Sequence, residues 1–109
     1  MTKKQIAVAS LSGLFLIVCL RTTISFARFS YVERHFDSIR ACGSRASVAA
    51  QFGRPNYHAG ACSADFSPPK GCASEYVYSH PFAPLLPDYY VVWFSSDDRA
   101  IDADHTISP

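Results

Sequence analysis

Two kinds of hydrophobic pattern divide the chain near residue 27. From Ile6 to Leu20, fifteen consecutive residues carry no charge, and Lys3 and Lys4 precede them. Apolar side chains in a run of this length prefer hydrocarbon to water, while the two lysines favour anionic headgroups. The rest of the chain shows the shorter periods of helices and strands. We therefore predict a membrane segment in residues 1–27, contacting lipid through residues 6–20, and one small domain in residues 28–109.

Three fates are open to the membrane segment. An uncleaved anchor needs about 20 apolar residues, and the residues that follow the run can extend it if Arg21 turns its guanidinium to the interface. A cleaved signal peptide needs small residues before the cut, and Ser25-Phe26-Ala27 would permit cutting before Arg28. Acylation of Cys19 would make a lipoprotein, although Val18 is not the small residue that normally precedes a lipidated cysteine.

Two helices are predicted at the start of the domain. Apolar residues at steps of three, four and three define one helical face over residues 28–40: Phe29, Val32, Phe36 and Ile39. Neither Gly nor Pro separates this helix from the membrane segment, so the two can be continuous, and Cys42-Gly43 is expected to end it. Ser44 can cap a second helix over residues 45–52, which Gly53 and the following Arg-Pro pair stop.

Three strands are predicted after the helices. Residues 74–79 alternate around two tyrosines, whereas residues 89–94 are apolar on both faces and belong in the middle of a sheet. A turn at residues 95–98 leads to a strand over residues 99–107 that pairs with its predecessor as a hairpin. The residues of this last strand that are expected to face inward are Ile101, Ala103 and Ile107. The predicted fold is α+β: an N-terminal membrane helix, then two short helices packed on a three-stranded antiparallel sheet.

Charge is unevenly distributed along the domain. Residues 21–54 contain six arginines and two acidic residues, a net charge of +4, whereas residues 65–109 contain two basic and seven acidic residues, a net charge of −5. Anionic lipid would attract the basic half at the membrane, and the acidic half would point away. No basic patch is combined with a recognition motif, so we predict no nucleic-acid binding.

The cysteines bear on the compartment. Cys62 and Cys72 bracket a polar loop rich in turn-forming residues, and a disulfide between them would contribute about 2–3 kcal/mol by constraining the unfolded chain. Such a bond implies an oxidising space such as the bacterial periplasm, although charge counting leaves the orientation open. Cys42 remains, either buried and reduced or competing for pairing. Zinc binding is the rival explanation, but no C-x₂-C spacing is present.

Asp102, Asp104 and His105 form the tightest cluster of potential metal ligands. The two aspartates share one strand face and could approach a hard cation, but His105 points to the opposite face. A solvated outer face explains the two aspartates without a metal. We therefore predict no metal site.

Cys42 with His58 or His80 could in principle form a thiol nucleophile and its base. No catalytic signature surrounds Cys42, and no phosphate-binding loop or Ser-His-Asp pattern is present. We therefore predict that the protein is not an enzyme and has no catalytic residue and no cofactor.

The run Pro81 to Pro87 carries a proline at every third residue, a spacing that favours polyproline II. Phe82, Leu85 and Leu86 are large apolar residues in this connection between strands. They either pack against the core of the domain or form a docking patch for a partner or lipid.

Residues 44–107 resemble the SmpA/OmlA family. The resemblance lies in Ser44-x₃-Val48-x₃-Phe52-Gly53-Arg54-Pro55, an aromatic strand, and the run from Tyr90 to Ile101. Members of that family are small lipoproteins of the bacterial outer-membrane assembly machinery with two helices and three strands. The resemblance implies the same fold and a role in envelope assembly.

These features together predict a membrane-tethered, non-catalytic structural or interaction protein of the bacterial cell envelope. We expect a single pass, an extracytoplasmic (periplasmic) domain and a protein partner. The alternative is a small membrane-anchored inhibitor or immunity-type binding protein, whose acidic half would meet a basic target.

Overall fold

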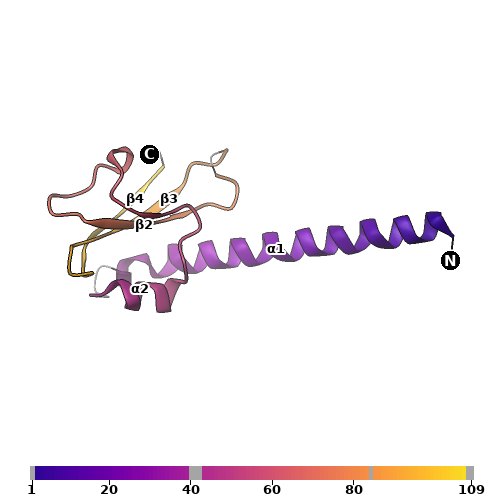
Figure 1. Ribbon diagram of the computed structural model, residues 1–109, viewed down its shortest axis with the longest axis horizontal. Helices are drawn as coiled ribbons and strands as arrows, with labels where there is room; N and C mark the ends of the chain where they lie inside the picture. Colours follow the sequence, from indigo (N-terminus) through magenta and orange to yellow (C-terminus); the bar gives the residue numbers. More distant parts are fainter. Residues whose placement is uncertain (1, 40–42, 84, 108–109) are drawn as a thin grey trace.

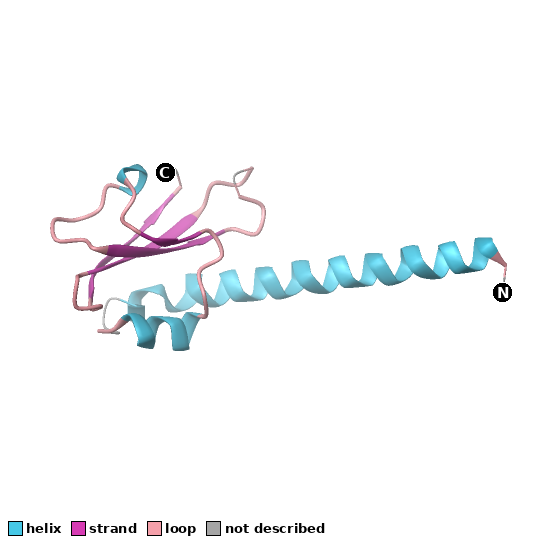
Figure 2. Cartoon of the chain, in the orientation of Figure 1, coloured by secondary structure: helices cyan, strands magenta, loops and turns pink. Residues whose placement is uncertain are grey.

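The computed structural model describes residues 2–39, 43–83 and 85–107 of the chain. It consists of a long helix with a small α+β domain at its C-terminal end, and its principal dimensions are 63 × 25 × 23 Å (Figure 1). Figure 2 shows the strands gathered above the end of the long helix and the helix extending far beyond them. The elements in chain order are α1 (Lys3–Ile39), α2 (Arg45–Phe52), β1 (His58–Gly60), the 3₁₀ turn η1 (Ala64–Phe66), β2 (Ser74–Ser79), β3 (Tyr89–Phe94) and β4 (Ala100–Thr106).

Helix α1 is uninterrupted over 37 residues, a length of about 55 Å at the usual rise per residue. It merges the predicted membrane segment with the helix predicted over residues 28–40, so the latter is not a separate short helix. The expected end at Cys42 lies outside the described residues. Among those residues, α1 alone is long and apolar enough to cross a membrane, and its most apolar window is not buried in the domain.

The two parts of α1 have different surroundings. Large apolar side chains between Ile6 and Leu20 are exposed all round the helix, whereas Phe29, Val32 and Phe36 are buried against the sheet. These three were predicted to share the inward face, and the side chain of Ile39, predicted with them, is outside the described part. One helix thus has an exposed apolar part and a part that is packed in a protein core.

Helix α2 matches its predicted bounds and caps. The Ser44 hydroxyl accepts a hydrogen bond from the Ser47 N–H at 3.1 Å, which satisfies one of the unpaired donors of the first turn. Gly53 has a φ of 78° and donates its N–H to the Ala49 carbonyl at 2.9 Å. A positive φ is costly for a residue with a Cβ, so glycine suits this stop. Val48 and Phe52 are the buried residues of α2.

The sheet has four antiparallel strands in the order β1-β2-β3-β4, not the three that the sequence predicted. The missed strand is β1, which pairs with β2 through three residues. Three residues including a glycine carry too little alternation to predict a strand. The bounds of β2 and β3 match the prediction, and β3 lies inside the sheet as expected.

Both faces of the sheet are covered. Helices α1 and α2 cover one face and form the helix-side core: Phe29, Val32, Phe36, Val48, Phe52, Tyr78, Tyr90, Val92, Phe94 and Ala103. The chain between β1 and β2 covers the other face and forms the loop-side core: Phe66, Val77, Tyr89, Val91 and Trp93. Strand β3 contributes three residues to each core, which explains why all six of its residues are buried.

Strand β4 departs from the predicted alternation. Ala103 is buried as expected, but Ile101 and Ile107 are 41% and 69% exposed. Opposite the step from Trp93 to Phe94, the pairing jumps from Asp102 to Ala100, so Ile101 occupies a bulge. A bulge changes the face to which a side chain points, and the sequence carries no signal for it.

Two aspartate side chains accept hydrogen bonds from backbone N–H groups of β4, which is the last strand of the sheet. The Asp102 carboxylate accepts a hydrogen bond from the Ala103 N–H at 2.8 Å, and the Asp104 carboxylate accepts one from the His105 N–H at 2.9 Å. Edge strands with unoccupied donors invite pairing with another chain. The two carboxylates therefore make this edge less able to accept a further strand, both by occupying donors and by their charge.

We expect the double variant Asp102→Ala, Asp104→Ala to self-associate through β4, because the edge loses two negative charges and the side-chain acceptor of the His105 N–H. Light scattering of the purified full-length chain in detergent would detect the increase in mass. The matched control, Asp37→Ala with Asp65→Ala, removes the same charge from exposed positions away from the edge. Equal masses for the two double variants would contradict a protective role of this pair.

Candidate membrane-proximal interaction site

The β2–β3 loop, residues 80–88, lies beside α1 at the end of the domain nearest the apolar part of the helix. The Phe82 ring contacts the Phe26 ring of α1 edge-on at 5.2 Å, and the His80 ring contacts Phe26 at the same distance. Figure 1 shows this loop, in orange, at the end of the sheet that faces in the direction of the N-terminus of α1. The loop therefore lies where α1 leaves the protein core.

The three residues proposed from the sequence as a docking patch are exposed. Phe82 is 49% exposed, Leu85 88% and Leu86 51%, although the Phe82 ring also touches α1. Packing against the core, the other possibility raised from the sequence, does not describe the two leucines. Their role in docking stays a prediction.

The loop that carries these side chains is held by backbone hydrogen bonds. The Ala83 N–H donates to the His80 carbonyl at 2.9 Å, and the Leu86 N–H donates to the Phe82 carbonyl at 3.2 Å. At its base the His80 N–H donates to the Asp88 carbonyl at 2.9 Å, closing the two strands. Donors satisfied in this way lower the cost of placing a loop in an apolar medium.

Arg28 of α1 and Arg54, which follows α2, lie close together on another side of α1. Along the axis of α1, Arg28 is only two residues beyond Phe26. The Arg28 guanidinium donates to the Arg54 carbonyl at 3.2 Å, and both residues are exposed. A small cavity of about 40 Å³ lies between α1 and β2, lined in part by these two arginines, Ser25 and Asn56. A cavity of this size has room for a few water molecules. The two exposed cations lie close to Phe26 along the axis of α1, but on a different side of the helix from the apolar loop.

Gly53 lets Arg28 approach the chain this closely. A Cβ at residue 53 would lie 2.7 Å from the Arg28 guanidinium, and φ there is positive. The Tyr78 hydroxyl donates to the Gly53 carbonyl at 2.8 Å. Burial raises the pKa of Tyr78 well above its ordinary value, so it remains a donor at physiological pH.

The candidate ligands Asp102, Asp104 and His105 do not converge. The two aspartates hydrogen-bond the strand itself, while His105 stacks on Tyr90 at 4.3 Å and pairs with Asp88. Burial raises the pKa of Tyr90 to about 12, with smaller contributions from Glu33 and Asp88. Within residues 2–39, 43–83 and 85–107, no three His, Cys, Asp or Glu side chains are placed to share a metal ion.

The thiol–imidazole hypothesis concerned Cys42 with His58 or His80. Cys42 lies outside the described residues. His80 contacts the rings of Phe26 and Phe29, and His58 lies 3.0 Å from the Ala61 carbonyl. Both histidines therefore have structural contacts of their own.

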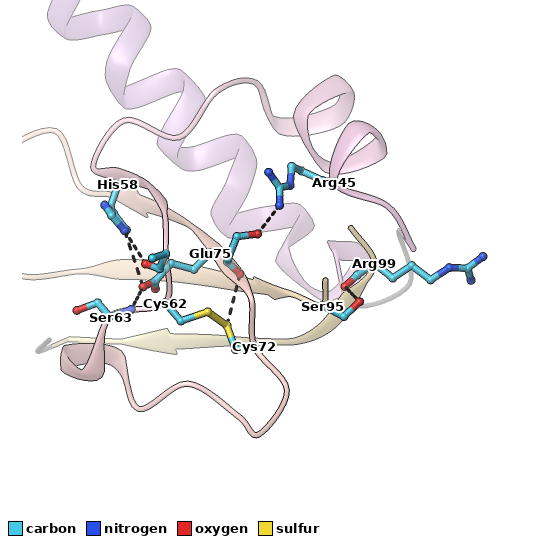
Figure 3. Close-up of a disulfide and its surroundings, with 10 residues drawn as sticks. Arg45, His58, Cys62, Ser63, Cys72, Glu75, Ser95 and Arg99 are labelled. Carbon is cyan, nitrogen blue, oxygen red and sulfur yellow. Dashed lines mark hydrogen bonds and ion pairs between the residues drawn. A yellow bond between two sulfur atoms is a disulfide. The ribbon is translucent and has the colours of Figure 1, made fainter. Parts of the chain in front are cut away.

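Cys62 and Cys72 form a disulfide, as the sequence predicted (Figure 3). The bridge closes the long connection between β1 and β2, and both cysteines pack against the loop-side core. Phe66 of η1 is buried in the same core. The bond therefore holds in place the segment that covers this face of the sheet.

A buried acid next to the disulfide was not found from the sequence. Glu75 is fully buried, and one of its carboxylate oxygens accepts a hydrogen bond from the Ser63 N–H (Figure 3). His58 lies 3.9 Å from the same oxygen. The alternation of residues 74–79 around two tyrosines carries no signal that Glu75 is buried. The loop tied by the disulfide covers this side chain.

The end of the domain away from the membrane segment carries paired charges. Arg45 contacts Asp98 at 2.7 Å, and Arg99 lies 3.9 Å from Asp97. A hydrogen bond from the Ser95 hydroxyl, with Arg99 adding a smaller effect, lowers the pKa of Asp97. Part of the predicted acidic surface is thus neutralised by the domain's own arginines.

Comparison with protein-family models, curated proteins and solved structures finds no match to this chain. The resemblance of residues 44–107 to the SmpA/OmlA family therefore stays a prediction.

We expect Glu75→Ala to lower the free energy of unfolding by about 1–3 kcal/mol, because the Ser63 N–H loses its acceptor in a buried place. Glu75→Gln retains an acceptor oxygen and is expected to cost less. Urea unfolding of the full-length chain, followed by Trp93 fluorescence, measures both, and Glu33→Ala on the exposed side of α1 is the control. Equal losses in the two Glu75 variants would contradict the assignment of the stabilisation to the Ser63 contact.

Proposed function

We propose that this chain is a membrane-tethered, non-catalytic interaction module of the bacterial envelope, with α1 as an uncleaved single-pass anchor and the α+β domain on the extracytoplasmic side. The continuity of α1 is the observation that carries the proposal. The helix that would cross the membrane also contributes Phe29, Val32 and Phe36 to the helix-side core.

This continuity favours an anchor over a cleaved signal peptide. A cut before Arg28 would come one residue before Phe29, the first buried residue of the domain, inside a regular helix. Signal peptides are cut in accessible segments that end an apolar region. Removing residues 1–27 would also remove Phe26, which packs on the β2–β3 loop.

The disulfide supports the extracytoplasmic side. Cytosolic thiols are kept reduced, whereas the periplasm maintains structural disulfides. The Cys62–Cys72 bond holds the cover of one core, so the fold depends on a compartment where it persists.

The argument for the anchored inhibitor is weakened by the charge pairs of the domain. It relied on an acidic half meeting a basic target, and Arg45 and Arg99 already pair with two of the acidic residues there. A role in envelope assembly rests on the resemblance to the SmpA/OmlA family alone.

We expect the chain to remain in membranes through an alkaline carbonate wash at the mass of the unprocessed polypeptide. Leu14→Lys with Leu16→Lys should shift it to the soluble fraction, because each lysine near the centre of a span costs about 2.5–3.5 kcal/mol. Ile101→Lys, at an exposed position of β4, is the matched control. Fractionation with intact mass spectrometry reads both outcomes, and a soluble product that begins at Arg28 would contradict the anchor.

The location of the domain can be tested by thiol labelling in a Cys19→Ser, Cys42→Ser variant, which retains only Cys62 and Cys72. In intact cells with a permeabilised outer membrane, we expect an impermeant maleimide to label it after reductant and not before. Thr2→Cys, on the other side of the span, should be labelled only after lysis. Labelling of Cys62 and Cys72 without reductant, and only after lysis, would place the domain in the cytoplasm.

A further inference from the structure

We propose that the β2–β3 loop is a second membrane contact, which inserts Phe82, Leu85 and Leu86 into the interface of the leaflet where α1 emerges. This inference rests on the proposed function, since it takes α1 as the span. It assigns to the loop one occupant, the boundary between the lipid hydrocarbon and the headgroups.

The position of the loop along α1 carries the inference. The hydrocarbon core is about 30 Å thick, which an upright helix crosses in about 20 residues. Counted from Ile6, the crossing ends near Ser25, and Arg21 lies close enough to that boundary to extend its guanidinium to the headgroups. Phe26 is the next residue, and it contacts Phe82. The loop is therefore held at the level where hydrocarbon gives way to headgroups.

The composition of the loop suits that level. No charged residue occurs between His80 and Asp88, and three large apolar side chains are exposed there. Aromatic and aliphatic side chains on a surface element partition into the interface, and the more apolar area they bury, the tighter the contact. The hydrogen bonds within the loop already satisfy some of its backbone donors.

The charges around the loop also fit a lipid surface. Arg28 and Arg54 are exposed, and Arg28 lies two residues beyond Phe26 along α1. At 3.6 residues per turn Arg28 points about 160° away from Phe26, toward the lipid surface on the other side of the helix. Cations at this height attract anionic phosphate headgroups. The acidic residues Asp97 and Asp98 lie in the β3–β4 turn, at the opposite end of the sheet from the β2–β3 loop. An exposed apolar loop beside the end of the span is suited to a bilayer surface, and contact with that surface is continuous with the contact that α1 makes.

The test places an environment-sensitive fluorophore on a cysteine at position 85 of the full-length Cys19→Ser, Cys42→Ser chain, with the Cys62–Cys72 disulfide intact. The chain is reconstituted in vesicles of phosphatidylcholine and phosphatidylglycerol. We expect a blue-shifted emission and a several-fold lower quenching constant for aqueous iodide than at position 101. Ile101→Cys is the matched control, because Ile101 is an exposed apolar residue at the far end of the sheet.

The outcomes are distinct. Vesicle flotation measures whether the chain is anchored in the bilayer, independently of the position of the loop. A chain that does not float overturns both the proposed function and this inference. A chain that floats with position 85 as accessible to iodide as position 101 overturns the inference alone. Protection of position 85 in native membranes but not in pure lipid vesicles also overturns it, and assigns the surface to a protein partner.

A second experiment compares two chains that both carry the fluorophore at Phe82→Cys. The chain with Leu85→Ser and Leu86→Ser should be quenched by iodide more strongly than the chain that keeps both leucines. Both leucines are exposed, so the unfolding midpoint should be unchanged. Continued protection of position 82 with an unchanged midpoint would overturn insertion by the leucines.

Discussion

The packing of the C-terminal part of α1 against the sheet determines how the rest of this protein is arranged. Phe29 and Phe36 contact the Tyr90 ring at 5.6 and 4.7 Å, and Val32 is almost completely buried between them. Tyr90 belongs to β3, the strand whose side chains enter both cores. Because these contacts are made by the same helix that carries the exposed apolar run, the position of the sheet relative to that run follows from side-chain packing and not from a linker.

The loop-side core depends on a different kind of constraint. A domain of this size has a modest core, and its helices cover only one face of the sheet. The connection between β1 and β2 serves as the second cover, and the disulfide and Glu75 fix it at two points. The carboxylate holds the backbone at Ser63, next to Cys62, so a polar contact and a covalent bond act on the same short stretch. The hydrogen bond from the Ser63 N–H offsets part of the cost of burying this polar side chain.

Sequence reasoning recovered the elements whose signals are local. The helix over residues 45–52 followed from its caps, and the two-faced burial of β3 followed from six consecutive apolar residues. It failed where the deciding contact is distant in sequence. The short strand β1 forms because β2 lies beside it, and the bulge at Ile101 depends on the pairing register with Trp93. The burial of Glu75 depends on the connection between β1 and β2, which packs over its side chain. For the candidate site, the three apolar residues of the β2–β3 loop were identified, but their height along α1 required the contact between Phe26 and Phe82.

The absence of a break in α1 has a mechanical consequence. From Leu14 to Ile39 the helix contains neither glycine nor proline, the residues at which helices usually bend. Membrane spans tilt to match the thickness of the bilayer around them. In the proposed anchor no such residue lies between the span and the sheet, so the domain would tilt with the span as one rigid body. The angle between the sheet and the membrane would then be coupled to local bilayer thickness.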